Sequence, residues 1–356
     1  MSAFDDLGGW PALLTELVEG RDLPATHARE AMGTILAGDA TAAQLIGFLV
    51  ALRAKGETPE ELSGLLDAVL AAATLVPLGE ELRSRAVDIV GTGGDRSHSI
   101  NVSTMSAIVV AGAGVPVCKH GARAASSQCG TADVLEELGV AIELSPNGVL
   151  RCIEQVGIGF CLAPKFHPAF RFAAPSRREI GIATVFNLLG PMANPGRVRR
   201  HVIGVANPAV AERMLASLRL HGSKHAWVVH GGGLDELTTT GTSTVLALDD
   251  DNVRTFTVDP VALGFAPAIP DELVGGTPPH NAEVVRRVLK GEHGAHRNIV
   301  LLNAAAGLVV AGATDSLEDG IVIAAASIDE GNAARTLDRW IHESQAAAAD
   351  LQSDQS

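Results

Sequence analysis

Short apolar segments alternate with helical segments from about residue 86 to residue 229, and this alternation restricts the fold more than any other feature of the sequence. Five segments have the continuous hydrophobicity of strands buried on both faces, as in a parallel sheet covered by helices. The expected strands are 86–90, 115–118, 158–162, 202–205 and 226–229, with helices expected at 103–111, 132–138, 146–156 and 209–220. We therefore predict an α/β protein with a mostly parallel central sheet and helices on both faces. In such sheets, ligands bind beyond the carboxyl ends of the strands.

The first 84 residues carry a different pattern, which indicates only helices. Thr41 and Thr58 are followed three residues later by Gln44 and Glu61, which is the pattern of a capping box. Apolar residues recur at helical spacing between positions 45 and 52. We therefore expect a small all-helical domain at 1–84 in front of a larger α/β domain.

The expected domain boundaries lie where the strand–helix rhythm breaks. Segment 170–198 interrupts it with a helical pattern and two proline-containing turns, and we expect this segment to complete the helical domain. Segments 85–169 and 199–345 then form the α/β domain. The polar, small-residue tail at 346–356 is expected to be frayed.

Composition and charge exclude several classes of function. The formal net charge is −14 and aromatic residues make up 3% with no tyrosine, so the chain lacks both the basic surface and the stacking platforms that favour nucleic acid. The four cysteines have no paired metal-ligand spacing, and the first residues do not resemble a secretion signal. No uncharged apolar run approaches the roughly 20 residues of a membrane helix. We expect a cytoplasmic protein that binds neither membrane nor nucleic acid.

The Gly-rich stretch after the first expected strand has the residues needed to hold a phosphorylated small molecule. Gly91, Gly93 and Gly94 allow backbone N–H groups to approach an anion, and the helix start that follows adds unpaired donors. Asp95 would repel a phosphate unless it accepts sugar hydroxyls or lies near a metal ion. The stretch thus indicates a phosphorylated sugar with magnesium, although a glycine turn after a strand is often only a turn.

Two further segments contain hydroxyl and cationic residues. Segment 101–104 could cap a helix, or its hydroxyls could turn toward a phosphate or a metal. Segment 119–127 contains Lys119, Arg123 and two serines, which together suit a pyrophosphate. The alternative for this segment is a polar surface loop.

Asp235 and Glu236 follow three glycines at the expected carboxyl end of a strand. Two hard oxygen ligands suit Mg²⁺, which keeps several waters and bridges to substrate phosphates, whereas adjacent acids on a loop also occur without a metal. Of Arg177 and Arg178, one could clamp a carboxylate bidentately while the other pairs with Glu179, and a solvated charge run is the alternative. In this order on an α/β frame, the clusters fit a nucleotide-like or phosphoribosyl ligand with Mg²⁺.

A succession of motifs resembles the anthranilate phosphoribosyltransferase family. The motifs are Gly-Thr-Gly-Gly-Asp (91–95), Asn-Val-Ser-Thr (101–104), Lys-His-Gly (119–121), Ala-Pro-Lys-Phe-His-Pro (163–168), Arg-Arg-Glu-Ile-Gly-Ile (177–182), Thr-Val-Phe-Asn-Leu-Leu-Gly-Pro (184–191) and Leu-Asp-Glu-Leu-Thr (234–238). The likeness covers nearly the whole chain. It implies transfer of the phosphoribosyl group of phosphoribosyl pyrophosphate (PRPP) to the amino group of anthranilate, releasing pyrophosphate, in tryptophan biosynthesis.

The resemblance also implies partners and site residues. It implies a homodimer formed through the helical domain, two Mg²⁺ ions, and electrostatic stabilisation by Lys119 with no side chain acting as an acid or base. PRPP would be bound by Gly91, Gly94, Asp95, Ser99, Asn101, Val102, Ser103, Thr104, Lys119, His120, Gly121, Ala122, Arg123, Ala124, Ala125, Ser126, Ser127 and Thr131. Anthranilate would be bordered by Gly91, His120, Ala122, Arg177 and Pro191, and magnesium would be held by Ser103, Asp235 and Glu236.

The chain departs from the family pattern at Ala122. The family usually reads Lys-His-Gly-Asn-Arg, and the asparagine offers an amide to the acceptor. Transfer to a different aromatic or heterocyclic amine is therefore an alternative function. A non-catalytic relative that binds nucleic acid is a second alternative, which predicts a basic surface and decayed phosphate motifs, whereas this chain is acidic and retains those motifs.

Overall fold

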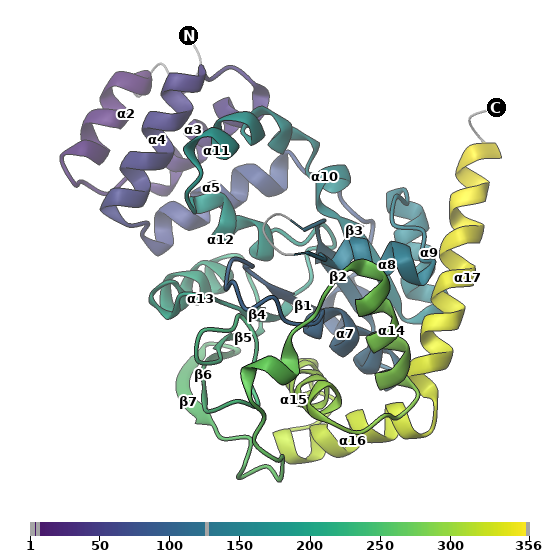
Figure 1. Ribbon diagram of the computed structural model, residues 1–356. Coiled ribbons are helices and arrows are strands. Elements are labelled where there is room, and N and C mark those ends of the chain that lie inside the picture. Colours follow the sequence, from purple (N-terminus) through teal and green to yellow (C-terminus); the bar gives the residue numbers. More distant parts are fainter. Residues whose placement is uncertain (1–3, 5–7, 125–127, 354–356) are drawn as a thin grey trace.

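The computed structural model describes residues 4, 8–124 and 128–353, and Figure 1 shows their arrangement. The described strands form one sheet with the order β3-β2-β1-β4-β5-β6-β7. The strands are β1 (Val87–Gly91), β2 (Val117–Gly121), β3 (Ile158–Leu162), β4 (Arg200–Gly204), β5 (His225–His230), β6 (Ser243–Asp249) and β7 (Asn252–Val258). The first five are parallel, while β6 and β7 add an antiparallel edge. The prediction of a mostly parallel sheet is confirmed, and the edge hairpin was not foreseen.

Helices account for most of the remaining described chain. The N-terminal helices are α2 (Gly9–Val18), α3 (Ala25–Ala37), α4 (Ala42–Lys55), α5 (Pro59–Ala71) and α6 (Glu80–Arg85). The middle of the chain contributes α7 (Val102–Gly112), α8 (Thr131–Leu138), α9 (Pro146–Val156), α10 (Ala163–Phe166), α11 (Ala174–Ile180), α12 (Val185–Met192) and α13 (Ala211–Leu220). The last part contains α14 (Pro278–Leu289), α15 (Ala295–Val310), α16 (Leu317–Asp329) and α17 (Asn332–Ser353), and short 3₁₀ helices are η1 (Pro168–Phe172), η2 (Pro208–Val210) and η3 (Pro270–Leu273).

Helices α2 to α5 form a bundle that stands beside the sheet (Figure 1). Both predicted capping boxes are present, at Thr41 with Gln44 and at Thr58 with Glu61. The Glu61 side chain is fully buried and also accepts a hydrogen bond from the Leu23 N–H, so the cap ties α5 to the connection between α2 and α3. Helix α11 packs on α4 and α12 packs on α5, which brings part of segment 170–198 against this bundle.

The two faces of the sheet belong to different cores because successive strand residues point to opposite sides. On one face, Val202 and Trp227 pack in the core that also contains residues of α7 and α15. On the other face, Ile203 and Val228 pack in the core shared with the bundle and α13. The helical bundle therefore packs directly on this second face of β4 and β5.

The C-terminal segment differs from its prediction. A frayed tail was expected at 346–356, but α17 continues through Ser353. Helix α17 packs on α9, and Arg151 of α9 pairs with Asp350 at 2.6 Å. The four alanines at 346–349 are strong helix formers, and α9 gives them a surface to cover. Within the described part of the chain, no helix is both long and apolar enough to cross a membrane.

Candidate active site

Loops that follow the parallel strands meet at the carboxyl end of the sheet. The backbone N–H of Gly93, in the loop after β1, donates to the Asp235 Oδ2 in the loop after β5 at 2.7 Å. The Gly-rich loop and the acidic loop are 142 residues apart in sequence, and the structure places them in direct contact. They lie where ligands of parallel sheets are expected.

Glycine is required at this junction by space as well as by backbone conformation. A Cβ at Gly91 would lie 2.9 Å from the Asp235 Cγ, and a Cβ at Gly204 would overlap the Asp235 carbonyl group. Gly93 and Gly94 have φ values of 68° and 79°, which side chains other than glycine rarely adopt. The acidic loop can therefore cross β1 and β4 closely only because both strands end in glycine.

Three carboxyl groups come together at the junction. Burial and the nearby charge of Asp95 raise the pKa of Asp235 to about 7. Burial and the charge of Asp235 raise the pKa of Glu236 well above its usual range. Carboxylates this close repel one another unless a cation lies among them, and oxygen ligands of this kind suit Mg²⁺.

Helix α7 begins beside these carboxylates, and the Ser103 backbone N–H donates to Glu236. Asn101 is the N-cap residue, but its side chain makes no cap hydrogen bond. Its Oδ1 instead accepts from Asn281 Nδ2 at 2.9 Å, and its Nδ2 donates to the Cys129 carbonyl at 3.2 Å. The Asn101 side chain therefore does not cap α7, because a tertiary contact uses its amide.

The strand expected at 115–118 ends too early in that prediction: β2 continues through Gly121, so Lys119 lies within the strand and not in the loop after it. The Lys119 side chain is 1% exposed, and its Nζ donates to the Ile89 carbonyl at 2.6 Å and to Ser103 Oγ at 3.3 Å. Burial lowers the pKa of Lys119, while the charges of Asp88 and Glu236 oppose that shift. The ammonium group thus lies beneath the start of α7, where it would favour a bound anion.

A buried polar network under the site was missed in the sequence. Asp88 is fully buried in β1, and it accepts hydrogen bonds from Asn194 Nδ2 at 2.8 Å and from the His120 N–H at 3.1 Å. Burial raises the pKa of Asp88 to about 6, and the charge of Lys119 opposes this shift. The available signal was a carboxylate inside an otherwise apolar strand, since such a group needs buried partners.

Two of the residues predicted to border anthranilate, His120 and Arg177, lie at the two ends of a series of ring contacts. The His120 Nδ1 donates to the Gly190 carbonyl at 3.1 Å, and burial lowers the pKa of His120 well below its usual value, so the ring is neutral. Its Nε2 is then an acceptor, and it has no partner among the described residues. Ring contacts at 5.1–5.2 Å run from His120 through His167 and Phe170 to Phe186.

The guanidinium group of Arg177 lies 4.8 Å from the centroid of the Phe186 ring. Burial lowers the pKa of Arg177, and within the described part of the chain it forms no ion pair. Pro191 is buried inside α12, next to the carbonyl group that holds His120. Arg177 is therefore a partly desolvated cation that is available to an anionic group.

The loop after β2 contains Ala122, the residue at which the chain departs from the family pattern. Ala122 is exposed, and its carbonyl accepts the N–H of Ala132 at 3.1 Å. Arg123, predicted to face pyrophosphate, is paired with Asp133 at 3.1 Å and with Glu136 at 2.8 Å. The predicted residues Ala125, Ser126 and Ser127 lie outside the described residues.

The remaining residues predicted to bind PRPP lie around the same loops. Thr104 and Thr131 hydrogen-bond to each other through their hydroxyl groups at 3.4 Å, which joins the starts of α7 and α8. Ser99 forms a β-bridge with Val274 beside the glycine loop. Gly121 ends β2, Val102 is buried at the start of α7, and the Ala124 N–H donates to Asp133 Oδ2 at 2.9 Å.

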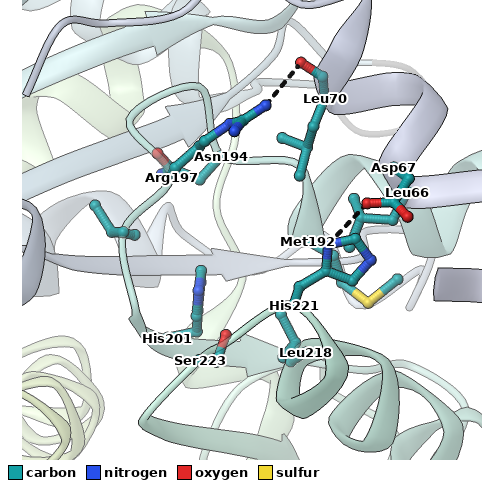
Figure 2. A pocket seen from close by; sticks show the side chains of 11 residues that line it. Leu66, Asp67, Leu70, Met192, Asn194, Arg197, His201, Leu218, His221 and Ser223 are labelled. Carbon is teal, nitrogen blue, oxygen red and sulfur yellow. Dashed lines mark hydrogen bonds and ion pairs between the residues drawn. The ribbon is translucent and has the colours of Figure 1, made fainter. Parts of the chain in front are cut away.

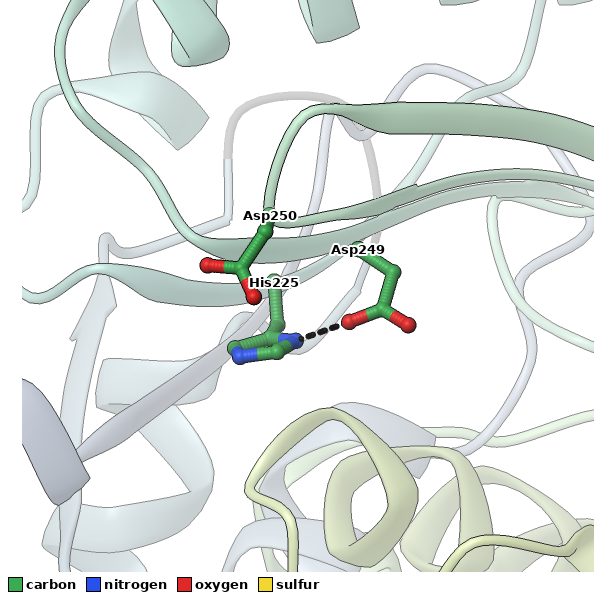
Figure 3. A group of neighbouring side chains, drawn as sticks. All are labelled: His225, Asp249 and Asp250. Carbon is green, nitrogen blue, oxygen red and sulfur yellow. Dashed lines mark ion pairs between the residues drawn. The ribbon is translucent and has the colours of Figure 1, made fainter.

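Two other features lie away from these loops. A cavity of about 130 Å³ lies between α5, the 192–198 segment and α13, and Figure 2 shows the His221–Asp67 pair and Arg197 in it. His225, Asp249 and Asp250 have ligand atoms within 4.8 Å of one another (Figure 3). His225 begins β5, whereas the acidic loop follows the end of β5, so this exposed cluster is not the predicted magnesium site.

Comparison with models of protein families identifies the class of protein to which the chain belongs. Residues 11–73 match the helical bundle domain of the glycosyl transferase family, and residues 83–334 match its α/β domain. The fold and the loops at its strand ends therefore define a two-part glycosyl transferase.

Similar sequences and structures narrow the class. The chain is 53% identical over 350 residues to the anthranilate phosphoribosyltransferase of Acidothermus cellulolyticus, covering 96% of this chain and 97% of that one. It is 49% identical over 337 residues to the enzyme of the same name from Salinispora arenicola, covering 93% and 96%. The crystal structure of anthranilate phosphoribosyltransferase from Thermus thermophilus superposes with a TM-score of 0.89 at 39% identity, covering 94% and 99%. The Saccharomyces cerevisiae enzyme in complex with PRPP and Mg superposes with a TM-score of 0.86 at 28% identity, covering 95% and 98%. The chain belongs to the anthranilate phosphoribosyltransferase family.

Proposed function

We propose that this protein transfers the phosphoribosyl group of PRPP to the amino group of anthranilate and releases pyrophosphate, as a step of tryptophan biosynthesis. The contact between the glycine loop and Asp235 carries this proposal, because it assembles phosphate donors and metal-ligating oxygens in one place. Relatives at 49–53% identity over almost the whole chain support it by their name.

The donor substrate would be bound by the loops after β1 and β2. Backbone N–H groups of the glycine loop and of the first turn of α7 would face the phosphates, and the buried Lys119 would favour the negative charge. Asp95 would accept hydroxyl groups of the ribose. The PRPP-binding residues that the sequence implies are retained in this proposal.

Two magnesium ions would be held by Ser103, Asp235 and Glu236. The donor set fits the ion, since the oxygen ligands are crowded carboxylates whose pKa values are raised by burial and by one another. When bound, magnesium neutralises the charge that grows on the departing pyrophosphate.

The reaction would be a displacement at the anomeric carbon. The C–O bond to pyrophosphate breaks, the bond from the anthranilate nitrogen to that carbon forms, and the nitrogen then loses a proton. A neutral aniline nitrogen is already nucleophilic, so the residues of this site need only orient it and stabilise the leaving group. Arg177 would pair with the anthranilate carboxylate, and Gly91, His120, Ala122 and Pro191 would border the ring.

The direct test is the loss of anthranilate fluorescence on addition of PRPP and Mg²⁺ to the purified protein. We expect a time-dependent loss that requires all three components. A constant signal at high anthranilate concentration would overturn the proposed function.

A second candidate function is transfer to a different aromatic or heterocyclic amine, and Ala122 is the observation that favours it. The usual asparagine amide is replaced by a methyl group at an exposed position beside the proposed acceptor residues. Release of pyrophosphate in a screen of aromatic amines, each with PRPP and Mg²⁺, separates the two functions. An amine that reacts more efficiently than anthranilate would favour this second candidate.

The helical domain, completed by part of 170–198, would also form the interface of a homodimer. The exposed Val18 of α2 and Val50 of α4, which are 77% and 41% exposed, supply apolar surface there. Light scattering coupled to gel filtration tests this, with Val18→Asp expected to shift the mass toward one chain and an unchanged mass counting against this interface.

A further inference from the structure

A cavity of about 280 Å³ lies between the end of α14 and the start of α15, two helices that are neighbours in Figure 1. Its polar lining consists of Glu272, Arg287, Glu292, His293, His296 and Arg297. None of these residues belongs to the proposed donor, acceptor or metal sites. The cavity is several times larger than the roughly 30 Å³ that a water molecule occupies in the liquid, so it has room for a small ligand.

The first turn of α15 is suited to bind an anion. The helix has 16 residues, and its N-cap residue is Gly294, which has no side chain to cap the first turn. The first turn contains no acidic residue either. Its unpaired N–H groups and the helix dipole therefore favour a negatively charged ligand.

A buried guanidinium group at the same place is an independent observation. Arg297 is 4% exposed, and its Nη2 donates to Asp329 Oδ2 at 2.8 Å. Its Nη1 is buried without a partner among the described residues, and the same holds for Arg287 Nε and His296 Nε2. Native proteins rarely leave so many buried polar atoms unpaired in one place.

Carboxylates near the cavity pair with one nitrogen of each guanidinium group: Asp329 with Arg297 Nη2 at 2.8 Å and Glu292 with Arg287 Nη1 at 3.2 Å. The side chains of Glu292 and Asp329 are 52% and 54% exposed, so water screens their charges. Glu272 already accepts the N–H of Ile269 at 2.9 Å and thereby caps η3. The charge deepest in the cavity is therefore the positive charge of Arg297.

We propose that this cavity is a binding site for a phosphate-type oxyanion, held by the first turn of α15 together with His296 and the guanidinium groups of Arg287 and Arg297. An oxyanion presents several acceptors at once, which matches the N–H groups of the first turn together with the unpaired Arg287 Nε and Arg297 Nη1. The site is separate from the proposed active site, and the proposal does not depend on the reaction.

The test is calorimetric titration of the full-length protein with inorganic phosphate at constant ionic strength. The variant combines Arg287→Gln and His296→Ala, both at positions that are only half-buried, and Arg286→Gln on the exposed side of α14 is the matched control. We expect the variant to weaken phosphate binding about tenfold or more, since the charge-assisted hydrogen bond lost with Arg287 is worth roughly a factor of ten. The control should bind as the wild type does.

Phosphate that binds only in the active site would be unaffected by either variant, and that result would overturn the proposal, as would the absence of phosphate binding. Crystals grown with phosphate give a second measurement that does not depend on variants. Density beside the N–H groups of residues 295–297 is expected, and an empty cavity in those crystals would contradict the site.

Discussion

The backbone of Gly204 in β4 lies directly against the backbone of Asp235 in the acidic loop. We therefore predict that Gly204→Ala strongly lowers the rate of turnover. An added Cβ at this position would lie 1.6 Å from the Asp235 carbonyl oxygen, whereas ordinary contacts begin at 3.4 Å. Bringing the distance from 1.6 Å to 3.4 Å requires the acidic loop or β4 to move by at least about 1.8 Å. Leu237 of the same loop is held by hydrogen bonds to Asn303 of α15 at 2.9 and 2.8 Å, so the loop cannot move freely.

Two magnitudes follow from this clash. Overpacking of this kind costs about 1–3 kcal/mol of the free energy of unfolding. A displacement of about 1 Å of catalytic groups costs roughly a hundredfold in rate, so turnover should fall by at least that factor. The measurements are thermal unfolding and the loss of anthranilate fluorescence at increasing Mg²⁺ concentration.

The matched control is Gly241→Ala. Gly241 lies in the connection between β5 and β6 that also contains the acidic loop, and a Cβ added there meets nothing within 4 Å. We expect this variant to keep the activity and stability of the wild type. If Gly204→Ala turned over anthranilate at the wild-type rate, the close crossing of the acidic loop over β4 would be refuted as a requirement for catalysis.

Three further predictions concern the metal, the acceptor and the response to pH. Asp235→Asn combined with Glu236→Gln should abolish turnover at low Mg²⁺ while leaving the protein folded by circular dichroism, and unchanged activity would exclude these residues as magnesium ligands. Ala122→Asn should lower the KM for anthranilate ten- to a hundredfold, equivalent to about 1–3 kcal/mol, because it restores an amide hydrogen bond; a higher KM would indicate a pocket shaped for another acceptor. Burial lowers the pKa of His201 from 6.5 to about 4. Between these two pH values the unfolded chain binds more protons than the folded chain does. The contribution of His201 to the free energy of unfolding is therefore complete above pH 6.5 and is lost as the pH falls toward 4. His201→Gln should remove roughly 3 kcal/mol of this acid-induced loss in chemical denaturation, and identical pH profiles would show that the histidine is not buried in its neutral form.

Much of the fold could be predicted because the relevant signals are local. Capping boxes at Thr41 and Thr58 depend on residues three positions apart, and the strands buried on both faces are continuous apolar runs. The end of the chain was mispredicted for the opposite reason. Its helix depends on packing against α9, and no local pattern shows that partner.

The candidate site was predicted by residue type more fully than by geometry. The sequence indicated that Gly91, Lys119 and Asp235 have suitable chemistry, but it gave no position for the Lys119 ammonium group, which is buried in β2 and not displayed on a loop. It also missed Asn194, whose amide satisfies Asp88 from 106 positions away.

By itself, the sequence determined the α/β class, the helical start and the residues able to bind a phosphorylated sugar with magnesium, because periodicity, glycine content and side-chain chemistry are properties of short segments. Only the tertiary structure decided that the glycine loop lies against Asp235, that Asn101 is held by Asn281, and that unpaired polar atoms gather between α14 and α15. Such contacts join residues far apart in the chain. They follow from the parallel register of β1, β4 and β5 and from the helices packed around them, and these become defined only when the whole chain has folded.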